Sequence, residues 1–280
     1  MHITINGKML ADGILQRELE STRRAHPEWT EAHINERARE SVIEWALIRE
    51  QAGQFGGPVP AAAVDAEFQK LVAQHGGQSE FLQAYGLKEA DVPRLREDIE
   101  QQLRVNRFLQ DLTRNVCPPA AEEVAVYYGE NQADFIAPEQ VHAAHIVRRP
   151  RAAAAVVQAL TELSAIRRRL LAGEDFLKTA AQEAAGADGS PDLGFFPRGQ
   201  MVPEFEAVVF SMNVGEISPV VQTPFGYHIA TVLARTPARQ RTLDECRAEI
   251  LDQLHTDSKN DSIGRWVDAQ KSVARIVVQE

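Results

Sequence analysis

The stretch DLGFFPRGQMVPEFE at residues 192–206 decides the fold class of the middle of the chain. Two shorter segments follow it, GEISPVVQT at residues 215–223 and GYHI at residues 226–229. The segment VHAAHIV at residues 141–147 precedes it and alternates between two sets of side chains, as a β-strand with two different faces does. Short apolar runs between Gly and Pro residues are typical of strands and turns. These segments therefore predict a mixed α+β domain.

The regions between these segments complete a β-α-α-α-β-β pattern over residues 137–236. The sequence predicts strands at residues 141–147, 217–222 and 227–233, helices at residues 152–171, 175–185 and 203–210, and a loop rich in Gly, Pro and Asp at residues 186–199.

The flanking regions have the periodicity of amphipathic helices. Residues 3–10 predict a short strand or hairpin around Asn6-Gly7, and helices are expected at residues 12–26, 30–52, 64–75, 81–85, 91–112 and 122–131. Leu95, Ile99 and Leu103 form an apolar stripe that requires a partner helix, a client segment or a second copy of the chain. Thr242 caps a last long helix, which is followed by a β-branched tail at residues 276–278.

Composition and charge narrow the possible functions. The chain has 280 residues, 44% hydrophobic and 25% charged, which is ordinary globular usage and long enough for two domains. Its formal net charge is −10, and residues 1–136 hold 22 acidic but only 14 basic side chains. Because an acidic chain repels phosphate backbones, we expect no general binding to nucleic acid.

Targeting and metal signals are also weak. Cys117 and Cys246 make no disulfide framework and no CxxC pair. His142 and His145 form an HxxH pattern, but on a strand they point to opposite faces, so we expect no metal site. The start has no signal-peptide pattern and no stretch is long enough to insert into a membrane, so we expect a cytoplasmic location, or a periplasmic one if a leader has been removed.

Together, these segments resemble the parvulin family of peptidyl-prolyl isomerases, in the order and spacing of that family. The resemblance covers residues 141–234 and implies a four-stranded antiparallel sheet, surrounded by helices, with a shallow groove for a proline-containing peptide. It implies that His145 and His228 are the family's facing histidines and that Thr223 is the hydroxyl joined to them. The implied substrate-binding residues are Leu193, Gln200, Met201, Phe205 and Phe225.

The family also places a Cys or Asp opposite the amide, shortly before the Asp-Leu-Gly segment. Here the loop at residues 183–191 is shortened. Asp188 matches that catalytic position best, because Gly189-Ser190 follows it in the family manner, and Glu183 is the alternative. Pro191 stands where the family has Gly, which stiffens the loop. These departures keep a weakly active or inactive domain open as an alternative.

Arginines cluster at two places in this domain. Arg148, Arg149 and Arg151 follow the first strand and are interpreted as a solvated group, with Arg149 as a possible contact for acidic peptides. Residues 167–169 are all arginine and lie near the end of a helix, where cations complement the helix dipole.

The helical regions resemble the SurA and PrsA class of foldases. The resemblance rests on the IxING start, on Tyr127-Tyr128 followed by Phe135, and on the C-terminal helix. Within that class, the layout of the NifM maturation factors is the most similar, including PARQ at residues 237–240 followed by Thr242-Leu243. It implies a helical chaperone lobe at residues 1–136, a parvulin domain at 137–236 and a helix at 237–280 that packs back on the lobe.

The sequence thus predicts a parvulin-type isomerase that assists protein folding. Isomerisation breaks no bond to proline, so no cofactor is expected. Its expected partners are unfolded or proline-containing polypeptides, and a homodimer is possible. The alternative is a holdase, or a maturation chaperone for particular clients, whose parvulin domain is weakly active or inactive.

Overall fold

A computed structural model describes residues 2–55, 57–183 and 190–279, and divides the chain into two compact units. The first unit contains Met1–Ala120 and Leu251–Glu280, and the second contains Ala121–Ile250. In the described part of the chain, every helix is too short or too polar to cross a membrane. The fold is mixed α+β, as predicted.

Helices make up most of the first unit, and a small sheet joins the two ends of the chain. Its helices are α1 (Asp12–Ala25), α2 (Glu31–Gln54), α3 (Ala61–Gln74), α4 (Gln78–Ala84), η1 (Glu89–Asp91) and α5 (Val92–Thr113). Its strands, in the order β2-β1-β9, are β1 (His2–Ile5), β2 (Lys8–Met9) and β9 (Ile276–Gln279). The β1–β2 hairpin turns through Asn6 and Gly7, with φ of 51° and 81°, as the Asn-Gly pair predicts.

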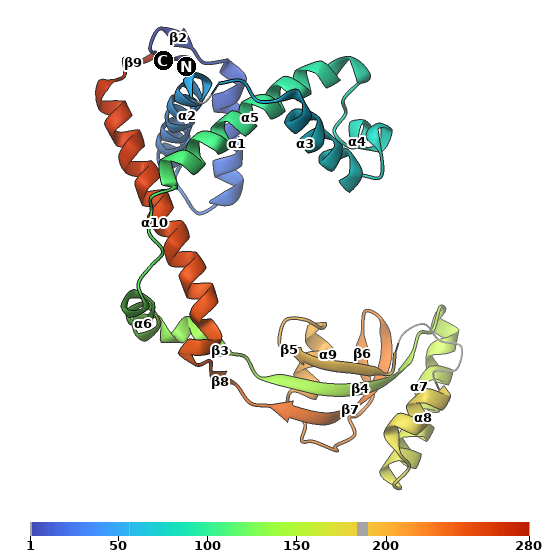
Figure 1. Ribbon diagram of the computed structural model, residues 1–280. Helices are drawn as coiled ribbons and strands as arrows, with labels where there is room; N and C mark the ends of the chain where they lie inside the picture. Colours follow the sequence, from blue (N-terminus) through green and yellow to red (C-terminus); the bar gives the residue numbers. More distant parts are fainter. Residues whose placement is uncertain (1, 56, 184–189, 280) are drawn as a thin grey trace. The chain divides into compact units, whose positions relative to one another are not determined.

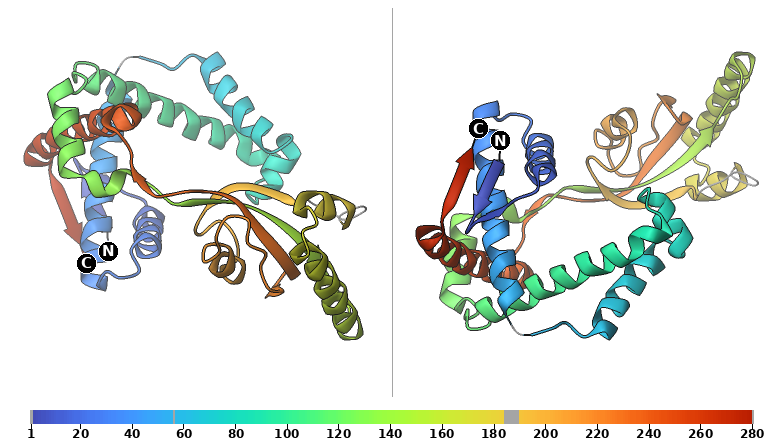
Figure 2. Two further views of the ribbon diagram at one scale, coloured as in Figure 1. Left: turned by 90° about the horizontal axis from the view of Figure 1, so that it is seen from below. Right: turned by 90° about the horizontal axis from the view of Figure 1, so that it is seen from above.

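The predicted β-branched tail is a strand. Residues 276–279 pair antiparallel with β1, so that Ile5 lies opposite Ile276, and Figure 2 shows the two strands side by side near both chain ends. The tail could not be assigned a partner from the sequence, because that partner lies almost the whole chain away. This pairing joins the C-terminal strand to the sheet of the helical unit.

The apolar stripe of α5 is covered by helices of the same unit. Leu95, Ile99 and Leu103 pack in a cluster with Phe68 of α3. Further along α5, the Phe108 ring lies 5.1 Å from the Trp266 ring of α10 (Leu243–Val273), measured between centroids. Of the occupants that the sequence left open for this stripe, the structure therefore shows partner helices.

The second unit is built on a four-stranded antiparallel sheet in the order β5-β4-β7-β6 (Figure 1). Its strands are β4 (Gln140–Arg148), β5 (Asp192–Pro197), β6 (Val221–Thr223) and β7 (Gly226–Thr236), and a short separate ribbon joins β3 (Ile136–Ala137) to β8 (Arg239–Gln240). Its helices are α6 (Ala121–Glu130), η2 (Gln132–Phe135), α7 (Ala153–Leu171), α8 (Phe176–Glu183), α9 (Pro203–Val209) and residues 243–250 of α10.

One strand lies where the local pattern predicted a loop. Residues 192–197 pair with β4, with Val141 opposite Phe196, and the register shifts between His142 and Ala144. Gly194 has φ of +68°, a conformation that favours glycine. A glycine in a short segment is also typical of a turn, so the local sequence did not indicate a strand here. The prediction of a loop over residues 186–199 is therefore wrong for 192–197, because pairing with β4 outweighs local propensity. The family resemblance did imply the fourth strand.

Two apolar clusters pack on the sheet. One contains Val141, Ala230 and Phe196 with Phe205 and Val209 of α9. The other joins residues of β4 and β7 to α7 and α8, and consists of Ile146, Leu163, Ile166, Leu170, Ala180 and Ile229. Side chains of β4 alternate between these clusters, so the strand is buried on both faces and holds its polar residues in fixed positions.

Gly226 permits a close approach at the start of β7. Its φ is +127°, and a Cβ at this position would lie 2.4 Å from the carbonyl oxygen of Arg148. No other residue type fits there without moving β4 away from β7. The glycine therefore fixes the spacing of the two central strands beside the candidate site.

Candidate active site

Two histidines from the central strands face one another in the second unit. His145 lies on β4 and His228 on β7, with their Nδ1 atoms 3.4 Å apart and their ring centroids 5.3 Å apart. His145 pairs with Ala230 and Val147 pairs with His228, so the two imidazoles are diagonal neighbours in the ladder. Residues 83 positions apart in sequence are thus brought into contact by strand register alone.

Thr223 extends this pair into a chain of polar contacts. Its Oγ1 lies 2.8 Å from Nε2 of His228, and it also accepts a hydrogen bond from the backbone N–H of Phe225 at 3.1 Å. Thr223 lies on β6, which pairs with the start of β7. The structure therefore brings together His145, His228 and Thr223, the three residues that the resemblance groups.

Both histidines are held neutral near pH 7. Burial, the neighbouring His145 and the Arg149 cation lower the pKa of His228 to about 4. Burial, followed by the Arg149 cation, also lowers the pKa of His145. Each neutral imidazole can donate from one ring nitrogen and accept at the other. The pair therefore supplies directional hydrogen bonding without a formal charge.

An apolar pocket of about 540 Å³ opens beside the histidines. Its lining comprises His145, Arg149, Leu193, Gln200, Met201, Val202, Pro203, Phe205, Thr223, Phe225 and His228. The Phe205 ring meets both imidazoles edge-on, with centroids 6.0 Å from His145 and 5.7 Å from His228. His145, His228, Thr223 and all five implied substrate-binding residues therefore line one pocket.

Glu206 holds the loop that carries part of this pocket, and the sequence did not indicate that role. Its carboxylate accepts hydrogen bonds from the backbone N–H groups of Gly199, at 2.9 Å, and Met201, at 2.8 Å. These backbone bonds, led by that of Gly199, lower the pKa of Glu206. The available signal was an acidic residue in the first turn of a proline-started helix, directly after a Gly-rich segment.

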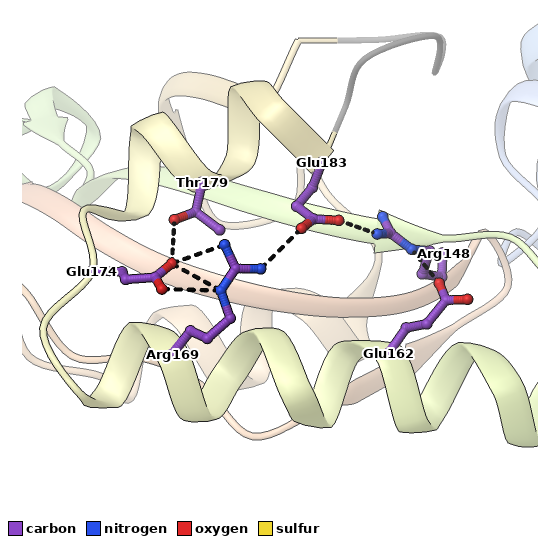
Figure 3. A network of polar contacts seen from close by, with 6 residues as sticks. All are labelled: Arg148, Glu162, Arg169, Glu174, Thr179 and Glu183. Atoms are coloured by element: carbon purple, nitrogen blue, oxygen red, sulfur yellow. Dashed lines mark hydrogen bonds and ion pairs between the residues drawn. The ribbon is translucent and has the colours of Figure 1, made fainter.

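Of the two candidates for the catalytic acid, one lies outside the described residues and the other has a structural role. Asp188 belongs to residues 184–189, which lie outside the described ranges. Glu183 pairs with Arg148 at 2.5 Å and with Arg169 at 3.3 Å (Figure 3). It does not line the pocket. The structure therefore gives no support to Glu183 as an active-site acid.

The predicted arginine clusters have more specific partners than solvent. Arg148 joins Glu162 of α7 to Glu183 of α8, and Arg169 joins Glu183 to Glu174, as Figure 3 shows. The interpretation of Arg148 as part of a solvated group is therefore wrong, because two helices place carboxylates around it. Arg149, the next residue, lines the pocket instead.

His142 takes no part in the pocket. Its Nε2 lies 2.7 Å from Oδ1 of Asp192, which also accepts the backbone N–H of Gly194 at 2.9 Å. The hydrogen bond from Gly194, followed by the one from His142, lowers the pKa of Asp192. Asp192 thus caps a turn. Within the described ranges, no three His, Cys, Asp or Glu side chains are grouped so that they could hold a metal ion.

This geometry agrees with the comparison of the chain with known protein families. Residues 119–248 match the family described as the PPIC-type PPIASE domain. The middle of the chain is a PPIC-type, or parvulin, domain. The matched range contains every residue of the pocket and extends into α10.

The curated relatives that match the chain include a foldase and a chaperone. The chain is 34% identical over 184 residues to the foldase protein PrsA of Caldanaerobacter subterraneus, covering 65% of this chain and 55% of PrsA. It is 31% identical over 189 residues to the chaperone SurA of Nitrosococcus oceani, covering 64% and 42%. The chain thus spans about half the length of these relatives.

Two further comparisons extend over most of the chain. The NifM protein of Azotobacter vinelandii is 26% identical over 240 residues, covering 82% of this chain and 80% of NifM. A solved structure of a SurA-like chaperone from Campylobacter jejuni covers 100% of this chain and 99% of its own, with a TM-score of 0.52 and 12% identity. At that identity the likeness concerns the fold, which is that of SurA-like chaperones.

Proposed function

We propose that this chain is a parvulin-type peptidyl-prolyl cis-trans isomerase that acts as a foldase. The observation that carries the proposal is the pair of neutral imidazoles, His145 and His228, beside an apolar pocket of about 540 Å³. The PPIC-type domain and the foldase and chaperone relatives support it. In this function His145, His228 and Thr223 are catalytic, with Asp188 as a further candidate outside the described residues.

The pocket suits the binding half of the reaction. Leu193, Met201 and Phe205 offer apolar surfaces that hold a proline ring without competing for the polar atoms of the amide. Gln200 and Phe225 lie beside them and contact the neighbouring peptide. The pocket holds the proline ring while the rest of the peptide stays free to rotate about the X–Pro bond. Binding energy can therefore stabilise the rotated transition state more than the planar isomers.

The histidines suit the rotation step. An X–Pro bond crosses a barrier of about 18–20 kcal/mol because twisting removes amide resonance. The planar amide is more dipolar than the twisted one, so an apolar site without formal charge at the imidazoles favours the twisted state. Neutral imidazoles also offer an oriented hydrogen bond as the amide nitrogen becomes a better acceptor. His145, His228 and Thr223 thus favour the transition state over either planar isomer.

The partners in this function are non-native polypeptides. The helical unit holds a client segment while the PPIC-type domain isomerises its X–Pro bonds, and tethering raises the local concentration of prolines at the pocket. The domain limits of 1–136, 137–236 and 237–280 and the cytoplasmic or periplasmic location stay predictions.

The test is cis-trans exchange of a short Ala-Pro peptide, measured by NMR with the full chain. We expect turnover to exceed the uncatalysed rate, for which relaxation takes on the order of 10–100 s. His228→Gln keeps a hydrogen-bonding side chain but removes the imidazole, and we expect kcat to fall by about tenfold or more. Thr231→Val is the control, since Thr231 lies on the same strand and does not line the pocket.

The alternative, a holdase or client-specific maturation chaperone, predicts a different pattern. The chain would suppress aggregation of an unfolded client, with no exchange above background in either the wild type or His228→Gln. The shortened loop before Asp192 is the feature that favours this alternative. Exchange that is catalysed equally by both proteins would contradict the role of His228.

A further inference from the structure

The first unit has a groove of its own, which the proposed isomerase reaction does not use. It has a volume of about 530 Å³ and lies between β2, the start of α1 and the C-terminal half of α2. Its apolar lining includes Met9, Leu10, Ile14 and Trp45. Arg49, Glu50 and Lys8 stand among these apolar side chains. The groove is large enough for several side chains of an extended peptide.

Two of the exposed large apolar side chains of the helical unit lie together in this groove. Met9 is 68% exposed and Trp45 is 39% exposed, and both line it. The apolar stripe of α5 in the same unit is already covered, because α3 packs on it. A methionine and a tryptophan together form an adaptable apolar surface of the kind that binding sites use.

Charge in the groove is opposite to that of its surroundings. The Arg49 guanidinium lies 4.8 Å from the centre of the Trp45 ring, and in the described part of the chain no carboxylate pairs with it. Glu50 already pairs with Lys8 at 3.5 Å and accepts a hydrogen bond from Asn6 at 2.7 Å. The groove is therefore locally cationic, although residues 1–136 carry an excess of acidic side chains.

The sheet edge beside the groove offers backbone groups to which an extended peptide can hydrogen-bond. In the order β2-β1-β9, β2 is an edge strand. Ile5 lies opposite Lys8, Thr4 lies opposite Met9, and the backbone N–H of Leu10 donates to Ile3. Because inward and outward groups alternate along an antiparallel pair, the N–H and C=O of Met9 point away from β1. An extended peptide could therefore pair along Met9 beside the groove.

We propose that this groove binds an extended apolar segment of a non-native polypeptide that carries a carboxylate beside its apolar side chains. The apolar side chains occupy the surface of Met9 and Trp45, and the carboxylate pairs with Arg49. The proposal rests on the chaperone part of the proposed function and is independent of the isomerase reaction, since it needs no proline in the client.

The test uses two short fluorescein-labelled peptides and the full-length chain. Both peptides contain Leu and Phe and no proline, so that they offer the PPIC-type pocket no substrate. One carries two Asp residues and the other carries Lys at the same positions. Fluorescence anisotropy gives Kd for each, and we expect the Asp peptide to bind about tenfold more tightly than the Lys peptide at low salt.

Two groove variants and two control variants separate specific binding from general stickiness. Met9→Ser removes apolar contact surface, and Arg49→Glu reverses the charge that the carboxylate contacts. Each variant is therefore expected to bind the Asp peptide about tenfold more weakly than the wild type. Arg49→Glu is expected to reverse the preference in favour of the Lys peptide. Tyr85→Ser and Arg24→Glu change an exposed aromatic and an exposed cation elsewhere in the unit, and their Kd values are expected to stay unchanged.

Each remaining outcome overturns the proposal. Equal Kd values for all variants, or no binding of either peptide, contradict the groove as a client site. Sedimentation that shows a dimer of the free chain, dissociated by Met9→Ser, would assign the groove to a second copy instead. Isomerase exchange on the Ala-Pro peptide is expected to be unchanged in Met9→Ser and Arg49→Glu, so loss of peptide binding and loss of catalysis are distinguishable.

Discussion

The two units differ in what they bury. The second unit buries the polar side chains of Thr179, Glu206, Ser218, Thr223, His228 and Thr231. In the first unit, the buried polar side chains among the described residues are Thr22 and Thr113, and Thr113 only returns a hydrogen bond to its own helix. Burial of a polar group costs free energy unless it is hydrogen-bonded. In the second unit, three of these buried polar residues belong to the candidate site or support it, namely Glu206, Thr223 and His228.

The second unit holds polar groups in fixed positions, whereas the first unit exposes an apolar surface. In the second unit, Ser218 accepts the backbone N–H of Ala230 at 2.8 Å, and Glu206 fixes the loop of Met201. The first unit instead exposes Met9 and Trp45 beside a cation. A reaction requires atoms placed to within a fraction of an ångström, whereas capture of varied clients benefits from an adaptable apolar surface.

The largest effect on stability is expected from a glycine-to-alanine substitution in the second unit, compared with the same substitution in the first unit. Gly226→Ala places a Cβ against the Arg148 carbonyl in a left-handed backbone, and we expect it to lower the free energy of unfolding by about 3 kcal/mol or more. Gly264→Ala, in α10, meets open space and is expected to stabilise the first unit by about 0.5–1 kcal/mol. Urea unfolding followed by circular dichroism measures both, and equal effects would contradict the contrast.

The second prediction concerns pH. The pKa of His228 is lowered to about 4, and that of His145 is also lowered, so both bind protons more readily when the chain is unfolded. Stability from these groups is therefore complete above about pH 6.5 and is lost as the pH falls towards 4. Thermal unfolding of the second unit should show this loss, and His228→Gln should reduce it. Histidine titration by NMR that gave an ordinary pKa for His228 would refute the prediction.

Two methionines provide the third prediction. Met201 lines the pocket of the second unit, and Met9 lines the groove of the first. We expect Met201→Ala to lower kcat/KM for an Ala-Pro peptide by about tenfold, mainly through KM, because it removes part of the surface that holds the ring. Met9→Ala should leave kcat/KM unchanged. Equal loss in both variants would show that the two units cannot be separated by function.

The smallest effect is expected in the ion network of Figure 3. Glu183 bridges Arg148 and Arg169, whereas Glu174 is more exposed and pairs with Arg169. We expect Glu183→Gln to lower the melting temperature of the second unit by a few degrees at most, and Glu174→Gln to leave it unchanged, since exposed ion pairs contribute little. A larger shift for Glu174→Gln than for Glu183→Gln would reverse this ranking.

Local patterns were sufficient to predict most helices, whereas the candidate pocket residues came from the family resemblance. Thr30 accepts the backbone N–H of His33 at 3.3 Å as an N-cap, and Thr242 and Glu245 form a capping box at the start of α10. Period and caps are encoded within a few residues, so the sequence alone determines these elements. That resemblance rests on the segments at 141–147, 192–206, 215–223 and 226–229, and it grouped His145, His228 and Thr223.

Tertiary structure decided what depends on partners distant in the chain. Residues 192–197 become a strand only because β4 lies beside them, and residues 276–279 only because β1 does. The carboxylate of Glu206 finds the backbone of Gly199 and Met201, and Arg49 finds the Trp45 ring, only once loops and helices have packed. Local sequence fixes which residues are present and how each segment can fold. The total free energy of contacts between residues distant in the sequence determines which segments pair and which side chains come into contact.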